Sequence, residues 1–387
     1  MHIFNVATAA ALLIIFTGCA RQPGEKTASL TFPETYAEIV HRNYQRSYET
    51  ALELQTAVHA FLAAPDDQTL AAARQAWFAA RKPYGQTEAF RFYEGPIDFA
   101  DPDSGQEGPE GQLNAWPLNE AFIDFVEGDA SAGLINKPGV PITREVLIER
   151  NGLDDEANVT TGYHAIEFLL WGQDLDADGP GDRSATDFIA GEADNDRRGQ
   201  YLNVVTDLLV ADLKTLMTAW APGQSSNYRA EFLAMDSKAQ IANVMTGLAT
   251  LSGFELASER IAVALDSGDQ EHEHSCFSDN THNDIIYNAQ GILNVCVGEY
   301  DTVGGTGLLK VVADADASLA DKLEKGLQQT QALAQKLEQP FDKLLASSAD
   351  SEARQTAELL VASLQAQSKL FVEAGGKLGV KVIVAAE

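Results

Sequence analysis

The 387-residue sequence is poor in cysteine and in basic residues, and it has no apolar run long enough to span a bilayer. Three cysteines cannot build a disulfide framework. With 27 Lys and Arg against 57 Asp and Glu, the net charge is −30, which argues against nucleic-acid binding because phosphates demand basic patches. The acidity keeps the chain soluble and concentrates cations around it. Nucleophile elbow, P-loop and dinucleotide fingerprints are also missing.

The N-terminus carries an apolar run from Val6 to Phe16 that ends at Thr17-Gly18-Cys19. This length fits the core of a secretory signal and is too short for a membrane span. We therefore predict a lipoprotein signal peptide over residues 1–19, lipidation of Cys19 and a linker over 20–32. The first residues hold only His2 and no Lys or Arg, so an ordinary signal peptide is the alternative. Both predict export, and the lipid anchor predicts attachment to the cell envelope, at the outer membrane facing the periplasm or the surface.

Helical periodicity dominates the rest of the chain. Apolar positions recur at three- and four-residue steps from Val40 to Phe61, and a second helical run from Thr69 continues to Phe92 with a break or kink expected at Pro83. These two runs predict an antiparallel helical hairpin. A Gly-, Pro- and Asp-rich connection follows over 95–111, and further helices are expected over 118–127, 143–150, 201–220, 238–266, 281–300, 317–345 and 351–373.

We predict an all-α fold, because no alternating β pattern separates these helices and the β-prone end, residues 380–384, would have no strand to pair with. Two helical bundles are expected to pack face to face, over residues 33–155 and 156–387. In each half of the chain, a pair of helices ends with acidic and basic residues. They are Glu88 and Arg91 in the first half, and Glu255, Glu259 and Arg260 in the second. This similarity suggests an internal duplication.

The segment 161–172 places His164 and Glu167 three residues apart inside an apolar run, so they share one face of a helix. An imidazole and a carboxylate are costly to bury without partners, and a cation between them is one solution. A hydrogen-bonded core pair is the other. Zincin and inverzincin motifs are excluded because Ala165 and Phe168 occupy positions that those motifs need. A ferritin-like di-iron site would need Glu-x-x-His on two helices. A His₂Glu set completed by a distant histidine remains open.

Further ligands could come from a polar stretch that holds three of the seven histidines: His272, His274, Cys276, Asp279, His282 and Asp284. Imidazole, thiolate and carboxylate together suit iron, copper or zinc, and a solvated loop is the alternative. Because ligating histidines are neutral, metal affinity is expected to fall below about pH 6.5. Cys276 and Cys296 could form a disulfide or stay free thiols.

The acidic loop that starts at Asp174 resembles the beginning of an EF-hand. Asp174, Asp176 and Asp178 stand at loop positions one, three and five, and Gly179 stands at six. Position twelve is Ala185 where the bidentate Glu should be. The sequence therefore favours a helix-ending turn over an EF-hand calcium site.

Several blocks resemble the imelysin family, in particular its iron-regulated protein A branch. They are the GxHxxE motif at Gly162, His164 and Glu167, WGQDLDADGPGDRSATDF after it, TEAFRFYEGPID and GPEGQLNAWPLNE before it, and HSCFSDNTHNDI further on. The resemblance implies that the motif lies at a functional site between two bundles. The resemblance implies that Glu88, Arg91 and Asp98 lie at this interface, and Glu259, at the end of the second helix pair, is expected there too. His274 and His282 are expected to be better ligands than His272, which stands where related sequences tend to be acidic.

The resemblance implies a metal-binding protein in iron acquisition, with iron as the first metal and zinc as the second, or a bound metal complex. Its expected partners are the membrane, through the lipid anchor, and iron-uptake components. The alternative is a metallopeptidase, since the family takes its name from an insulin-cleaving membrane protease, and Glu167 would then be the catalytic residue. A cell-surface scaffold held together by the motif is a third hypothesis.

Overall fold

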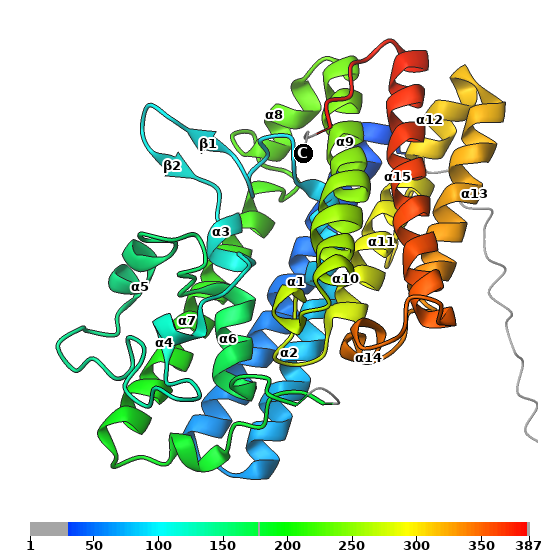
Figure 1. The fold of residues 1–387 in the computed structure, drawn as a ribbon. Helices are drawn as coiled ribbons and strands as arrows, with labels where there is room; N and C mark the ends of the chain where they lie inside the picture. Colours follow the sequence, from blue (N-terminus) through cyan, green and yellow to red (C-terminus); the bar gives the residue numbers. More distant parts are fainter. Residues whose placement is uncertain (1–29, 177–178, 385–387) are drawn as a thin grey trace, which may run out of the picture.

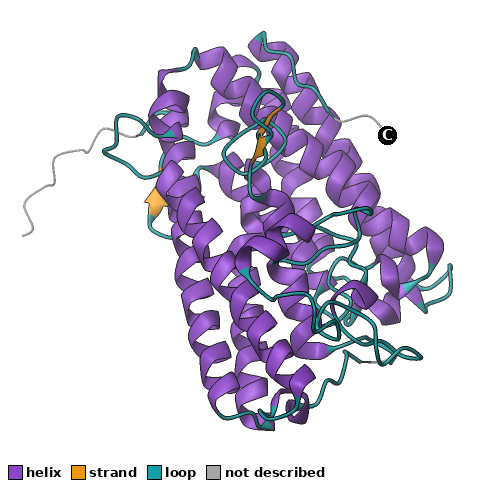
Figure 2. Ribbon diagram, turned by 90° about the vertical axis from the view of Figure 1, so that its left-hand side faces the viewer, coloured by secondary structure: helices purple, strands orange, loops and turns teal. Residues whose placement is uncertain are grey.

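The computed structural model describes residues 30–176 and 179–384, so Cys19, the signal peptide and Asp178 lie outside the described residues. The fold is almost wholly helical (Figures 1 and 2), which confirms the all-α prediction. The longer helices are α1 (Phe32–Ala63), α2 (Asp67–Thr87), α6 (Gly162–Trp171), α7 (Ala193–Ala219), α9 (Ser237–Thr250), α11 (Thr281–Val297), α13 (Ala317–Ala334) and α15 (Glu352–Leu378). The described strands are two-residue pairs, β1 (Ala100–Asp101) with β2 (Gln106–Glu107) and β3 (Glu299–Tyr300) with β4 (Val303–Gly304).

Short helices fill the connections between the long ones. They are η1 (Glu88–Phe90), α3 (Glu110–Leu113), α4 (Glu120–Ile123), α5 (Arg144–Arg150), η2 (Ala185–Phe188), α8 (Tyr228–Ala234), α10 (Val263–Ser267), η4 (Gln270–His272), α12 (Leu308–Ala315) and α14 (Phe341–Leu345). The expected helix over 317–345 is interrupted before Pro340, and the apolar end of the chain up to residue 384 forms no strand.

The predicted helical hairpin is confirmed by α1 and α2, which pack along each other. A capping box starts each helix, with Thr31 and Glu34 in α1 and Asp66 and Thr69 in α2. Helix α2 runs through Pro83 without ending there.

The hairpin lies between two groups of helices, as Figure 1 shows. Helices α6 and α7 pack on α2 and α1 on one side, and α11 packs on α2 on the other. Helices α13 and α15 then follow α11 outward. The buried hydrophobic side chains form one continuous cluster through these helices. Because the two expected bundles do not have separate cores, the domain boundary between residues 155 and 156 stays a prediction.

A π-helix continues α9 into α10. This element, η3 (Leu251–Ala262), covers 12 residues of the helix expected over 238–266. Short π segments inside α-helices are frequent at functional sites. The π-helical geometry brings side chains five residues apart onto the same face, which an α-helix would not do. Arg260 Nη2 thus bonds Glu255 Oε1, five residues earlier, at 2.9 Å.

Among the described residues, no helix is both long and apolar enough to cross a membrane. Cys276 and Cys296 are free, buried thiols, so the disulfide alternative is wrong.

Candidate functional site

Helix α6 is a core helix, with all ten of its residues buried, as expected for a helix that is apolar on every side. It starts at Gly162, whose φ of +84° falls in the left-handed region. A Cβ there would lie 2.5 Å from the carbonyl oxygen of Leu113. Only glycine fits this approach, and that fixes the start of the helix carrying His164 and Glu167.

The predicted pair is in direct contact. His164 Nδ1 lies 2.9 Å from Glu167 Oε2, and both side chains are fully buried. The other oxygen, Oε1, accepts hydrogen bonds from the backbone N–H and the hydroxyl of Ser278, at 3.1 and 2.6 Å. Both carboxylate oxygens are therefore occupied. The remaining ring nitrogen, His164 Nε2, is buried and has no hydrogen-bond partner.

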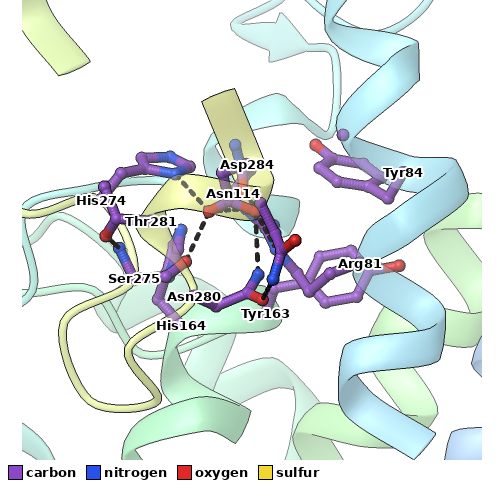
Figure 3. Close-up of polar contacts among 12 residues, drawn as sticks. Arg81, Tyr84, Asn114, Tyr163, His164, His274, Ser275, Asn280, Thr281 and Asp284 are labelled. Atoms are coloured by element: carbon purple, nitrogen blue, oxygen red, sulfur yellow. Dashed lines mark hydrogen bonds and ion pairs between the residues drawn. The ribbon is translucent and has the colours of Figure 1, made fainter. Parts of the chain in front are cut away.

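A second imidazole repeats this arrangement. His274 Nδ1 lies 2.8 Å from Asp284 Oδ2, which also accepts from the Ser275 hydroxyl at 2.6 Å (Figure 3). Arg81 of α2 bonds both oxygens of Asp284, with Nη2 at 2.8 Å and Nε at 3.2 Å. A buried arginine from α2 and a buried carboxylate from α11 thus orient the His274 ring.

The two imidazoles lie together under one indole. The ring centroids of His164 and His274 are 4.7 Å apart with planes at 79°. Trp116 lies 4.9 Å from the first ring and 6.3 Å from the second. Each Nδ1 is held by a carboxylate, which leaves Nε2 as the open nitrogen of each ring. Metal-binding histidines are oriented by carboxylates in this way.

The electrostatics of the site keep both rings neutral. Burial lowers the pKa of His164 well below its ordinary range, and the neighbouring His274 and Arg81 act in the same direction. Burial and the Arg260 charge lower the pKa of His274 to about 4, although Asp284 opposes them. Burial raises the pKa of Glu167, against its bonds from Ser278. Neutral imidazole is the form that binds metals.

A cleft of about 340 Å³ opens beside His274. The π-helix η3 supplies one wall with Glu255, Glu259 and Arg260, and the segment 114–117 supplies another. Arg91, Glu259, His272 and His274, which the sequence singled out, all line this cleft.

Two arginines that line the cleft, Arg91 and Arg260, belong to a charge network centred on the buried Glu88. Its Oε2 bonds Arg91 at 2.6 Å and Arg260 at 2.8 Å. Burial raises the pKa of Glu88, but the two arginines outweigh it and lower the pKa to about 2. Arg91 also reaches Glu110 at 3.1 Å, and Arg260 reaches Glu255 at 2.9 Å. Glu88 and Arg91 are therefore a buried pair and not a surface one.

The other predicted site residues lie outside the histidine pair. The carboxylate of Asp98 accepts backbone N–H groups of Phe92 and Gly95 and holds the turn after η1. His282, at the start of α11, has a buried Nδ1 with no hydrogen-bond partner. Cys276 is buried, and burial raises the pKa of its thiol. Asp279 lies beside Asp174 and Asp342. Within the described residues, this acidic group is the only set of three or more His, Cys, Asp or Glu side chains whose possible ligand atoms all lie within 4.8 Å of one another.

Several residues of the site were not predicted from the sequence: Arg81, Asn114, Trp116, Ser275 and Ser278. Arg81 could have been predicted from the sequence. It falls on the helical face that also carries Trp77 and Tyr84, and a charged side chain on a buried face needs a partner. Asn114 accepts from Arg81 Nη1 at 2.6 Å and belongs to a loop for which helical periodicity gives no guidance.

Fold and site together define an all-α protein with a carboxylate-oriented histidine pair beside a charged cleft. The sequence profile of the imelysin family matches residues 40–371, and the chain belongs to this family. It is 25% identical to iron-regulated protein A of Synechococcus elongatus over 365 residues, which cover 92% of this chain and 88% of that protein.

Two solved structures share the fold. One is a proposed iron-regulated protein A precursor from Parabacteroides distasonis, with a TM-score of 0.66 at 20% identity over 92% of this chain and 98% of that chain. The other is an imelysin-like protein from Psychrobacter arcticum, with a TM-score of 0.63 at 16% identity over 92% of this chain and 99% of that chain. The recognition of the family from sequence is therefore confirmed.

Proposed function

We propose that this protein is an exported binding protein that holds a transition metal, iron first and zinc second, or a complex of that metal, at His164 and His274. The single observation that carries the proposal is the pair of buried imidazoles 4.7 Å apart, each with Nδ1 held by a carboxylate. Relatives are named for iron regulation, which favours iron. The role we infer is iron acquisition.

The chemistry of the donors supports this choice. Nitrogen donors suit iron, zinc and copper better than calcium or magnesium. Two imidazoles fill part of a coordination shell, so water or a ligand in the adjoining cleft would complete it. Because the pKa of His274 is about 4, proton competition at this ring would start near pH 4 rather than near 6.5, the value of an unperturbed histidine. The net charge of −30 would further favour cation entry.

Export and membrane attachment belong to the same proposal. The apolar run that ends at Thr17-Gly18-Cys19 supports a lipidated Cys19 in the mature protein. A lipid anchor would keep the metal site at the outer membrane, close to iron-uptake components. Intact mass after membrane extraction tests this part, and an unlipidated soluble form would overturn it.

The metallopeptidase alternative is weakened by the contacts of Glu167. A general base needs a free carboxylate oxygen within reach of the attacking water. Oε2 of Glu167 faces His164 and Oε1 faces Ser278, so neither oxygen is free to take that proton. The carboxylate orients a ring in this arrangement.

The test is metal binding by untagged protein. Bound metals are measured by mass spectrometry after purification, and Fe²⁺ and Zn²⁺ are titrated anaerobically in a calorimeter. We expect His164→Ala and His274→Ala to weaken binding at least tenfold. His272→Ala is the matched control, since this exposed ring lines the same cleft and bonds only Ser267, and it should bind as wild type does. His282→Ala tests the other candidate ligand.

Circular dichroism must show unchanged helix content in each variant. Equal binding by wild type, His164→Ala and His274→Ala would overturn the proposal. Metal-dependent cleavage of an unfolded protein that Glu167→Gln abolishes, with metal still bound, would instead establish the peptidase.

A further inference from the structure

A second cluster of ligand atoms includes neither histidine of the pair and is made of carboxylates alone. Asp174, Asp279 and Asp342 each place one carboxylate oxygen so that all three atoms lie within 4.8 Å of one another. They come from separate parts of the chain: the loop after α6, the loop before α11, and α14. Three acidic side chains that meet from three segments repel one another unless something neutralises them.

Few hydrogen bonds satisfy the carboxylate oxygens of this cluster. Asp174 and Asp342 are only 3% and 4% exposed. Asp174 Oδ2, Asp279 Oδ1 and both oxygens of Asp342 are buried and have no hydrogen-bond partner among the described residues. Native proteins leave few buried polar atoms unpaired, and an unpaired buried carboxylate is among the costliest.

A fourth carboxylate extends the cluster. Glu273 is fully buried, and its polar neighbours are the Asp342 carboxyl group and the Thr281 hydroxyl. Asp342 and Asp279 are the charged residues that act most strongly on it. Within residues 30–176 and 179–384, the main charges acting on Asp174, Asp279 and Glu273 include no arginine or lysine, so none of these residues plays the part that Arg81 plays for Asp284.

We propose that Asp174, Asp279 and Asp342, supported by Glu273, bind a hard divalent cation, with Ca²⁺ preferred over Mg²⁺. A set of oxygen donors excludes metals that prefer thiolate or imidazole. Calcium accepts six to eight oxygens in irregular geometry, whereas Mg²⁺ usually takes one or two carboxylates and keeps its waters. This site is not the EF-hand that the sequence of the 174–185 loop argues against, since two of its ligands come from elsewhere in the chain.

The site would support the histidine pair without taking part in it. Asp279 follows Ser278, which donates both hydrogen bonds to Glu167. Asp174 lies two residues after Gly172, which caps α6. A cation here would tie the loop that carries His274 and Ser278 to the end of α6 and to α14.

Calcium binding is tested on chelator-treated full-length protein by calorimetry and by the melting temperature with and without 1 mM CaCl₂ at pH 7.5. We expect saturable binding to the wild type, a melting temperature several degrees higher with calcium, and a weaker response to magnesium. Asp342→Asn should bind calcium at least tenfold more weakly. Asp350→Asn, an exposed carboxylate in the loop after α14, is the matched control and should respond as wild type does.

The calcium-free proteins give a second, independent readout. Asp342→Asn removes one repelling charge, so without calcium it should melt at or above the wild-type temperature while losing the calcium response. A lower melting temperature without calcium, or equal calcium affinity in Asp342→Asn and Asp350→Asn, would overturn the proposal. A wild type that binds no calcium would show that shared protons neutralise the cluster. His164→Ala should keep the calcium response, which separates this test from that of the histidine site.

Discussion

Replacing Arg81 with methionine should destabilise the protein by about 3–5 kcal/mol, the range for removing one partner of a buried ion pair. Arg81 is 1% exposed and bonds both oxygens of Asp284, at 2.8 and 3.2 Å. Methionine retains much of the apolar stem but leaves Asp284 as a buried, unpaired charge. Because Ser275, His274 and Asn280 still contact that carboxylate, the loss should lie near the lower end of the range.

The effect should depend on pH in a defined direction. Burial raises the pKa of Asp284, but Arg81 and His274 outweigh it and lower the pKa well below the ordinary value of 3.8. A carboxylate with a lowered pKa stabilises the fold above its unfolded pKa and loses that contribution as the pH falls through the folded value. The stability that Asp284 contributes to the wild type should therefore be full at pH 6 and be lost as the pH falls below 3.8, and the advantage of the wild type over Arg81→Met should shrink as it is lost.

Urea unfolding followed by circular dichroism measures both effects. Arg46→Met is the control, because Arg46 is 42% exposed and pairs with Glu49 across one helical turn, and its loss should cost less than about 1 kcal/mol. The double variant Arg81→Met/Asp284→Asn should recover part of the stability, since the uncompensated charge is gone. Equal destabilisation by Arg81→Met and Arg46→Met would refute this account of the site.

Three further outcomes are expected. Gly162→Ala should cost about 1–3 kcal/mol from the positive φ alone and more from the contact with the Leu113 carbonyl, measured by urea unfolding against Gly111→Ala, where a Cβ meets nothing within 4 Å. Glu88 should contribute about 3 kcal/mol to the free energy of unfolding, and this contribution should be lost as the pH falls from 4.5 to about 2. In Glu88→Gln, the free energy of unfolding should change less with pH over this range than it does in the wild type. Cys276 and Cys296 should react with a thiol reagent only after unfolding, because burial raises the pKa of both; reaction at native pH 8 would contradict their burial.

The sequence predicted the long helices whose apolar residues recur at regular spacing. Helical periodicity located α1, α2, α7, α11 and α15, because each presents a regular apolar face to the core. The contact between His164 and Glu167 followed from their spacing alone. The cleft residue Arg91 was named through the family resemblance, and Glu259 was named from the charged end of the second helix pair.

Other features depend on tertiary contacts that no local pattern encodes. Asp284 was visible as one of several polar residues, but its bond to Arg81 joins positions 203 residues apart. Asp342 gave no signal, since it is one acid among 57 and its meeting with Asp174 and Asp279 depends on three irregular segments. The π-helix η3 was equally hidden, because its side chains suit an α-helix just as well.

The length of η3 matters as much as its composition. In an α-helix, residues five apart differ in direction by about 140°, so Glu255 and Arg260 could not bond each other on one wall of a cleft. If residues 251–262 adopted α geometry with these two residues still five apart, one of the two side chains would turn away from the cleft wall. The position of these charged groups on the cleft wall thus depends on the π-helical geometry as well as on which residues are present.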